Sequence, residues 1–330
     1  MCLERAASAI RTMPMTETFR SVAVVGAGAV GSFFGGMLAR AGRPVTLIAR
    51  PAHVQAIESA GLQLRMAGRT ETVRTAASAD LAAVRGADLV LFCVKSTDTD
   101  AVAQAIAPHL EPGALVVSLQ NGVENAPTIA RRVRQTVVPA VVYVATAMPA
   151  PGTVEHHGRG DLVVGGLDRQ STGDATFMRR LHALVDLFAA AQVPVRISHD
   201  VMGELWSKLM VNCAYNAISG IAQVDYGHLV ALPEARALQE AVVREVVAVA
   251  QAEGVNLPLD GALEAMRRIA PAMPGQYSST AQDMQRGKRS EIDHLNGFVA
   301  RRGSELGIAT PANQALHALV KLIEAQRGTR

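Results

Sequence analysis

The chain has 330 residues, a formal net charge of +3 and a hydrophobic content of 49% with few aromatic side chains. This length allows two domains with cores of their own, and the composition suits an α/β protein with long helices. The sequence pI of about 8.9 comes without a cluster of lysines and arginines, and no apolar run is long enough to span a bilayer, so we expect neither a nucleic-acid nor a membrane partner.

The start of the chain and the cysteines indicate the compartment. Residues 1–20 fit no core pattern and lack the apolar segment of a secretory signal, so we interpret them as a loose tail, or as the product of a start site placed ahead of Met13 or Met15. The cysteines are Cys2, Cys93 and Cys213. Their spacing fits neither a disulfide framework nor a zinc site, which predicts a reducing, cytoplasmic compartment, and the last two lie in apolar runs typical of buried side chains.

A glycine-rich turn follows the first apolar run, Val22–Val25, and its glycines hold the first, third and sixth positions of a G-x-G-x-x-G motif. The first glycine permits the tight turn out of a strand, the second lets backbone N–H groups approach a pyrophosphate, and the third lets the next helix pack closely. The predicted cofactor-binding segment is Gly26, Ala27, Gly28, Ala29, Val30 and Gly31. We expect a helix over about residues 29–41 whose amino end attracts the phosphates, with a glycine turn that binds nothing as the alternative.

Arg50 lies at the tip of a predicted second strand, residues 45–49. In this architecture that position contacts the adenosine ribose of a dinucleotide. No Asp or Glu is present there to bind the 2′-hydroxyl of NAD, whereas an arginine can pair bidentately with a 2′-phosphate. The sequence therefore predicts NADP(H) as the cofactor, against the alternative of a solvated surface arginine.

Strand-like runs continue to residue 197. They are a small hairpin around Gly68 and the segments 87–94, 115–119, 137–145, 161–166 and 193–197. Lys95 and Asn121 each follow one of these runs closely, at the carboxyl edge of the expected sheet, where open α/β sheets bind their ligands. Each is as easily a plain turn residue as a contact to cofactor or substrate.

After residue 199 the strand-like runs give way to 3.6-residue periodicity. The expected helices span residues 200–220, 234–253, 259–270, 280–306 and 312–326. Asp200 fits an N-cap, and Gly254 and Gly307 fit helix ends. The sequence thus predicts an α/β fold in which a Rossmann-type doubly wound NADP-binding domain, residues 21–198, precedes an all-helical substrate and catalytic domain, residues 199–330, with a cleft between them.

The first of these helices carries polar groups among apolar neighbours. Lys208, Asn212 and Asn216 recur every four residues and so share one face. A buried ammonium and two carboxamides cost free energy unless they find partners, and asparagine is a poor residue for a helix interior. The pattern favours a catalytic or binding face. The alternative is a structural polar seam in which Lys208 pairs with Glu204 one turn earlier.

Further polar residues lie outside this helix. Ser278 or Ser279 can cap a later helix, although hydroxyls and free N–H groups at a helix start also suit a substrate carboxylate. Glu291 can equally be a solvated carboxylate. His156 and His157 lie in a glycine-rich loop, so we interpret this pair as surface residues and expect no metal site.

Together these residues resemble the ketopantoate reductase family (2-dehydropantoate 2-reductase) from Val22 to about Leu322. The matching motifs are Gly26–Gly31, Lys95-Ser96, Gln120-Asn121-Gly122, Lys208–Asn212, Asn216, Ser278-Ser279, Glu291–Gly297 and Thr310–Asn313. The resemblance implies an NADPH-dependent oxidoreductase that makes pantoate from ketopantoate, a small 2-oxo acid, for pantothenate and coenzyme A synthesis.

The resemblance also implies residue roles. The glycine turn and Arg50 would hold the pyrophosphate and the 2′-phosphate, and Lys208 would be the general acid that protonates the reduced ketone oxygen. The cofactor site would be completed by Lys95, Asn121, Ala145 and Glu291. The substrate would be bound by Asn121, Lys208, Asn212, Asn216, Ser278 and Ser279. Tyr226 stands where well-known members have a further substrate-binding asparagine, which leaves the exact substrate open.

Two other functions stay open. One is an NADPH-dependent reductase of another 2-oxo acid or carbonyl compound. The other is a non-catalytic NADPH-binding redox sensor, which should keep the glycine turn and lose the lysine face, so that Lys208, Asn212 and Asn216 count against it. The sequence does not determine the oligomeric state, a homodimer being one option.

Overall fold

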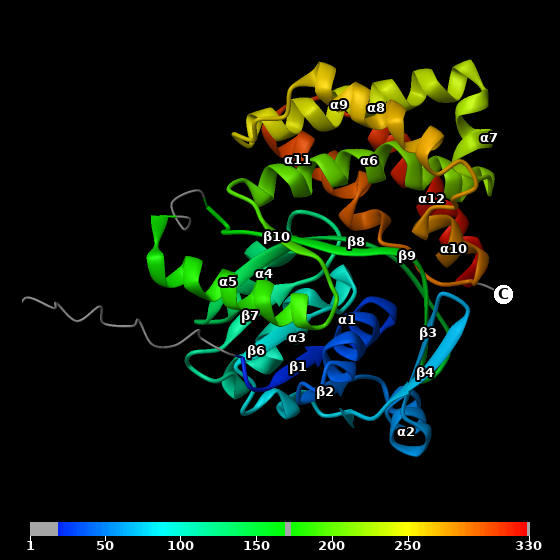
Figure 1. Ribbon diagram of the computed structural model, residues 1–330. Coiled ribbons are helices and arrows are strands. Elements are labelled where there is room, and N and C mark those ends of the chain that lie inside the picture. Colours follow the sequence, from blue (N-terminus) through cyan, green and yellow to red (C-terminus); the bar gives the residue numbers. More distant parts are fainter. Residues whose placement is uncertain (1–18, 169–172, 329–330) are drawn as a thin grey trace, which may run out of the picture.

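The computed structural model describes residues 19–168 and 173–328. A curled sheet flanked by helices forms the first part of the chain, and a layer of helices forms the second (Figure 1). After Ile197 no strand occurs in the described residues. This confirms the predicted α/β class, with a Rossmann-type sheet followed by a helical region. The domain boundary near Ser198 and the loose tail, which lies outside the described residues, stay predictions.

The strands belong to one sheet. They are β1 (Val22–Val25), β2 (Val45–Ile48), β3 (Leu62–Met66), β4 (Arg69–Val73), β5 (Ala76–Ser78), β6 (Leu89–Phe92), β7 (Leu115–Ser118), β8 (Thr136–Ala150), β9 (Thr153–Val164) and β10 (Val195–Ile197). Their order is β4-β3-β9-β8-β7-β6-β1-β2-β5, and β10 pairs with β9. The run from β8 to β5 is parallel, whereas β8 and β9 pair as a long antiparallel hairpin. The predicted hairpin around Gly68 is confirmed as β3 and β4.

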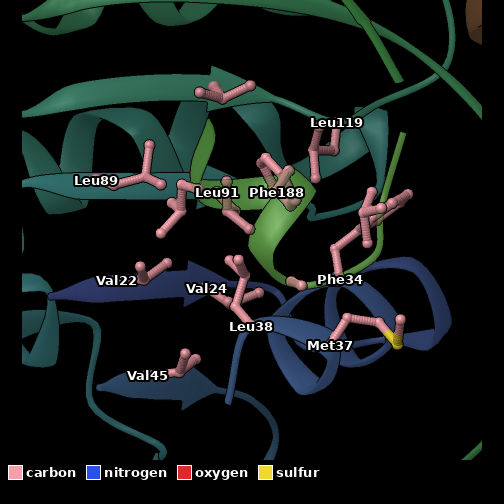
Figure 2. Packing of buried hydrophobic residues seen from close by; sticks show 14 of the residues in the cluster. Val22, Val24, Phe34, Met37, Leu38, Val45, Leu89, Leu91, Leu119 and Phe188 are labelled. Carbon is pink, nitrogen blue, oxygen red and sulfur yellow. The ribbon is translucent and has the colours of Figure 1, made fainter. Parts of the chain in front are cut away.

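Helices cover both faces of the parallel strands. They are α1 (Ala29–Arg40), α2 (Pro51–Ala60), α3 (Thr99–Ile106), α4 (Asn125–Arg132) and α5 (Ala175–Ala190). Successive strand residues point to opposite faces: Val24 and Leu91 pack with residues of α1 and α5, whereas Val25 packs with residues of α3 and α4. Figure 2 shows the first of these cores, where Phe34 and Phe188 face the strand side chains. The sheet is therefore doubly wound, as predicted.

The helical region is built around its longest helix. Its helices are α6 (Val201–Ala222), α7 (Tyr226–Ala231), α8 (Pro233–Ala252), α9 (Leu259–Ala272), α10 (Ser279–Gln285), α11 (Asn296–Leu306) and α12 (Pro311–Gly328). α6 packs against α8, α10 and α12, and its other side meets β8 (Figure 1). Asp200 caps α6 by accepting a hydrogen bond from the N–H of Gly203, as expected. None of the described helices is long and apolar enough to cross a bilayer.

The single helix expected at residues 280–306 is wrong. α10 ends at Gln285, Gly287 adopts a φ of +65°, and a 3-10 turn at Ile292–His294 precedes α11. The break has a tertiary cause, because the segment before the 3-10 turn leaves the helical path to meet the carboxyl edge of the sheet. There Glu291 accepts hydrogen bonds from Ser96.

Candidate active site

In the glycine turn, two of the three motif glycines are closely packed and the third faces open space. At Gly31 a Cβ would lie 2.6 Å from the carbonyl oxygen of Gly26, and at Gly26, with a φ of +87°, it would lie 2.7 Å from the N of Val94. These two glycines serve the fold. At Gly28, which is exposed, a Cβ would meet nothing within 4 Å. No side chain caps the first turn of α1 and no acidic residue lies in it, so this end of the helix suits the pyrophosphate of a dinucleotide.

Arg50 begins the turn into α2, directly after the carboxyl end of β2. Its side chain is exposed and forms no ion pair or hydrogen bond with any described residue. Partial burial, and then the positive charges of Arg50 and Lys288, lower the pKa of nearby His53. Arg50 and Lys288 thus both lie close enough to His53 to lower its pKa, and two cations near this edge of the sheet suit a phosphate group.

Lys208 projects from α6 toward the sheet. Its Nζ donates hydrogen bonds to Oδ1 of Asn121 at 2.9 Å and to the carbonyl oxygen of Val142 at 2.5 Å, and lies 5.7 Å from the ring centroid of Tyr143. Burial lowers the pKa of Lys208 to about 8, Glu291 opposes this lowering and Arg159 adds to it. An amine with such a pKa can hold a proton at neutral pH and release it readily.

Asn121 joins this amine to a carboxylate. While its Oδ1 accepts from Lys208, its Nδ2 donates to Oε2 of Glu291 at 3.4 Å. The other oxygen of Glu291 accepts from the N–H and the hydroxyl of Ser96, at 3.0 and 2.9 Å. The ends of two parallel strands, a central helix and the turn before α11 thus meet in one chain of polar contacts.

The predicted substrate face continues along α6. Asn212 is half-buried and its amide bonds to no described residue, while buried Asn216 donates to Oγ of Ser279 at 3.5 Å. Ser278 is 1% exposed and caps α10, because its hydroxyl accepts from the N–H of Ala281 and donates to the carbonyl oxygen of Asn216. Ser279 is the exposed hydroxyl of the pair, so Asn212 and Ser279 keep groups free to bind a ligand.

Lys95 lies beside this chain of contacts and ties the sheet to the helical region. Its Nζ donates to the carbonyl oxygen of Arg289 at 2.7 Å and forms an ion pair with Asp283 at 3.2 Å. Ala145 lies in β8, opposite Gly158, and is half-buried. Both keep their predicted cofactor roles as predictions.

Four expectations about individual residues are resolved by the geometry. Glu204 pairs with Arg196 rather than with Lys208, so the predicted alternative of a Lys208–Glu204 seam is wrong. Cys213 is buried as expected, whereas Cys93 is partly exposed at the end of β6. His156 and His157 lie in β9 and not in the predicted loop; His157 is exposed as expected, whereas His156 is half-buried and stacks on Phe33, with ring centroids 4.6 Å apart. Apart from these outcomes, no cluster of His, Cys, Asp or Glu among the described residues could hold a metal ion, and the expected absence of a metal site stays a prediction.

Tyr226 belongs to the helical core. It is 8% exposed and its ring lies 4.6 Å from that of Tyr215. Burial and the neighbouring Tyr215 raise its pKa. This explains how the position accepts a large aromatic side chain.

Several side chains behind the site have no role predicted from the sequence. Ser96 and Gln120 lie within two of the matching motifs, and Thr99 and Asn125 lie just beyond them. All four are buried and hydrogen-bonded to one another. The available signal was a run of polar residues directly after two apolar strands.

A dinucleotide-binding sheet edge facing a lysine on a helix defines the class: this is a nicotinamide-dependent oxidoreductase that acts on CH–OH groups. Family models match the chain in two parts, "Ketopantoate reductase PanE/ApbA" over residues 22–169 and "Ketopantoate reductase PanE/ApbA C terminal" over residues 200–324. The chain therefore belongs to the ketopantoate reductase family.

Similar proteins support this membership. The 2-dehydropantoate 2-reductases of Halobacterium salinarum and Vibrio cholerae are 33% and 31% identical, each over 92% of this chain and 98% of their own. A PanE/ApbA family ketopantoate reductase from Ralstonia eutropha is 56% identical, with a TM-score of 0.86 over 93% of this chain and 99% of its own. D-mandelate dehydrogenase, in a ternary structure with NADH and anilino(oxo)acetate, is 25% identical, with a TM-score of 0.85 and the same coverage.

Proposed function

We propose that the protein reduces 2-dehydropantoate to pantoate with NADPH, with Lys208 as the general acid. The observation that carries this proposal is the Lys208 amine, which Asn121 and the Val142 carbonyl hold at the carboxyl edge of the dinucleotide-binding sheet. Curated relatives that span nearly the whole chain share the name of this activity.

Each part of the site has its own role in the proposed reaction. The nicotinamide supplies the hydride when the cofactor is bound. Negative charge then develops on the ketone oxygen of the substrate, which the ammonium of Lys208 stabilises and protonates. Asn121 holds that ammonium in place. The amide of Asn212 and the exposed hydroxyl of Ser279, which accepts from Asn216 and can still donate, can bind the carboxylate or hydroxyl of a 2-oxo acid.

Arg50 supports NADPH over NADH. It stands free at the tip of β2, and Lys288 adds positive charge near the same place. An arginine at this tip can pair with a 2′-phosphate, whereas the diol of NAD offers it no charge to bind.

The first experiment compares substrates and removes the acid. NADPH oxidation is followed with 2-dehydropantoate and with a panel of other 2-oxo acids. The proteins compared are the wild type, Lys208→Ala and the control variant Lys321→Ala. Lys321 lies on α12 and pairs with Asp293. We expect Lys208→Ala to lower kcat by about 10²-fold or more while NADPH affinity is largely kept. Lys321→Ala should behave as the wild type. Near-normal turnover of Lys208→Ala would refute the acid role.

A second candidate is the reduction of a different 2-oxo acid. The buried Tyr226 and the likeness to D-mandelate dehydrogenase favour it. It becomes the better assignment if another member of the panel has a higher kcat/KM than 2-dehydropantoate. Absence of turnover with every member, together with tight NADPH binding, would instead support the redox-sensor alternative.

A further inference from the structure

A buried polar network lies behind the site, at the carboxyl ends of β6 and β7. Its side chains are Ser96, Thr99, Ser118, Gln120 and Asn125, none of them more than 6% exposed. The side chain of Gln120 donates to the hydroxyl of Thr99 at 2.7 Å and to the carbonyl oxygen of Val94 at 2.9 Å. Because unpaired buried polar groups are costly, a fully paired network of this kind holds its members in one arrangement.

Asn125, the first residue of α4, is the member that links the two residues in contact with Glu291. Its Nδ2 donates to the carbonyl oxygen of Asn121 at 2.5 Å and to Oγ of Ser96 at 3.1 Å. Its Oδ1 accepts from the hydroxyl of Thr99 at 2.8 Å, which fixes the orientation of the amide. Asn125 thus contacts the two residues that touch Glu291, and one of these also touches Lys208.

The network leads to the reacting groups by two routes. Through the main chain of Asn121, Asn125 fixes the loop whose side chain contacts both Lys208 and Glu291. Through Ser96, whose hydroxyl lies 2.9 Å from Oε1, it fixes the carboxylate of Glu291. A misplacement of about 1 Å at such groups can cost about 10²-fold in rate.

We propose that Asn125 is a positioning residue of the reductase, which holds Asn121 and, through Ser96, Glu291 in the arrangement that the Lys208 amine requires. Asn125 touches none of the reacting atoms, and this role rests on the proposed function. The competing explanation is that Asn125 only stabilises the start of α4.

The pH dependence separates these explanations. The charged groups that act on Lys208 are Glu291, which raises its pKa, and Arg159, which lowers it. Two other nearby carboxylates are already paired, Glu204 with Arg196 and Asp161 with Arg159. If Glu291 is released from its place, the pKa of Lys208 falls, and the alkaline limb of kcat moves to lower pH. A purely structural role changes the thermal midpoint and leaves this limb in place.

The experiment measures kcat, KM for the 2-oxo acid, the pH profile of kcat and the thermal midpoint for the wild type, Asn125→Ala and Ser96→Ala. We expect Asn125→Ala to lower kcat about tenfold or more with little change in KM, and to shift the alkaline limb downward. Ser96→Ala, which keeps the N–H bond to Glu291, should give a smaller change of the same sign. In the double variant, the fold decrease in kcat should be smaller than the product of the two single-variant decreases, because both substitutions act through Glu291.

Asn313→Ala is the matched control, since Asn313 is a fully buried asparagine in the first turn of α12, hydrogen-bonded to Asn296 and Glu245. It should lower the thermal midpoint without moving kcat or the pH limb. The proposal is overturned if Asn125→Ala keeps the wild-type kcat and the wild-type alkaline limb. If Asn125→Ala does not fold, the same result for Ser96→Ala overturns the proposal. Lack of turnover in the wild type would instead overturn the proposed function.

Discussion

At the scale of single residues, the site depends on one amine whose charge is balanced by its surroundings. Burial favours the neutral form of Lys208, and Glu291 favours the charged form. The resulting pKa of about 8 lies close to neutral pH, where a general acid is most effective.

This balance predicts the pH dependence of turnover. The acid must carry its proton, so kcat should be full below the pKa of Lys208 and fall as the pH rises through about 8. In Asn121→Asp a carboxylate would replace the amide oxygen that lies 2.9 Å from Nζ. Because it stabilises the ammonium, the alkaline limb should move to higher pH, whatever happens to the maximal rate. If the alkaline limb stays at the same pH in Asn121→Asp, this limb does not report the titration of Lys208.

Arg50 predicts the cofactor preference. Arg50→Ala removes the cation at the tip of β2, so the dissociation constant of NADPH should rise by about tenfold or more while that of NADH changes little. Fluorescence titration with both cofactors measures the two constants. The matched control is Arg65→Ala, an exposed arginine of β3. Equal losses for NADPH and NADH would mean that Arg50 does not bind the 2′-phosphate.

At the scale of elements, the glycines of the strand–turn–helix unit differ in what requires them. The fold requires Gly31, whereas Gly28 has open space and is predicted to lie against the cofactor. Gly31→Ala would push a Cβ against the Gly26 carbonyl, and overpacking of this kind costs about 1–3 kcal/mol. We expect its free energy of unfolding to fall, although alanine favours the helix. A denaturant titration that shows no loss would contradict this.

Gly28→Ala is the counterpart of that variant. Its Cβ has open space, so the free energy of unfolding should fall by less than about 1 kcal/mol, the usual effect at a helix N-cap. The added methyl group would occupy the place predicted for the pyrophosphate, so cofactor affinity should fall instead. Equal cofactor affinity in Gly28→Ala and the wild type would exclude a pyrophosphate at this turn.

Local patterns predicted the principal strands and several helices well, and tertiary contacts account for much of the rest. Apolar runs such as Leu89–Phe92 gave buried parallel strands, and the period of α6 gave its polar face. α4 was not expected, because it has only eight residues and its buried face carries only two apolar side chains, Ala126 and Ile129, which pack against the sheet. The break between α10 and α11 was also not foreseen, since Glu291 is drawn to a residue 195 positions away.

At the scale of the whole molecule, the two regions meet through apolar packing of α6 on β8 and β9, and through a few polar contacts at the carboxyl edge of the sheet. Lys208 reaches Asn121, Glu291 reaches Ser96, and Lys95 reaches Asp283 and the Arg289 carbonyl. Each contact joins a residue that follows β6 or β7 to one on α6 or the segment from Asp283 to Glu291. The proposed site is therefore complete only when both regions are in place.

The sequence by itself determined the class of fold, the strand–turn–helix unit with its glycine turn, and the shared face of Lys208, Asn212 and Asn216, because these depend on residues within a few turns of one another. Only the tertiary structure decided that Lys208 binds Asn121 and not Glu204, that Ser278 is used as a cap, and that Asn125 stands behind Glu291. The cap of Ser278 is local, but its hydroxyl also donates to the carbonyl oxygen of Asn216, 62 positions away, and the other contacts likewise join residues far apart in the chain. The choice among competing partners follows from burial and distance, which periodicity does not encode.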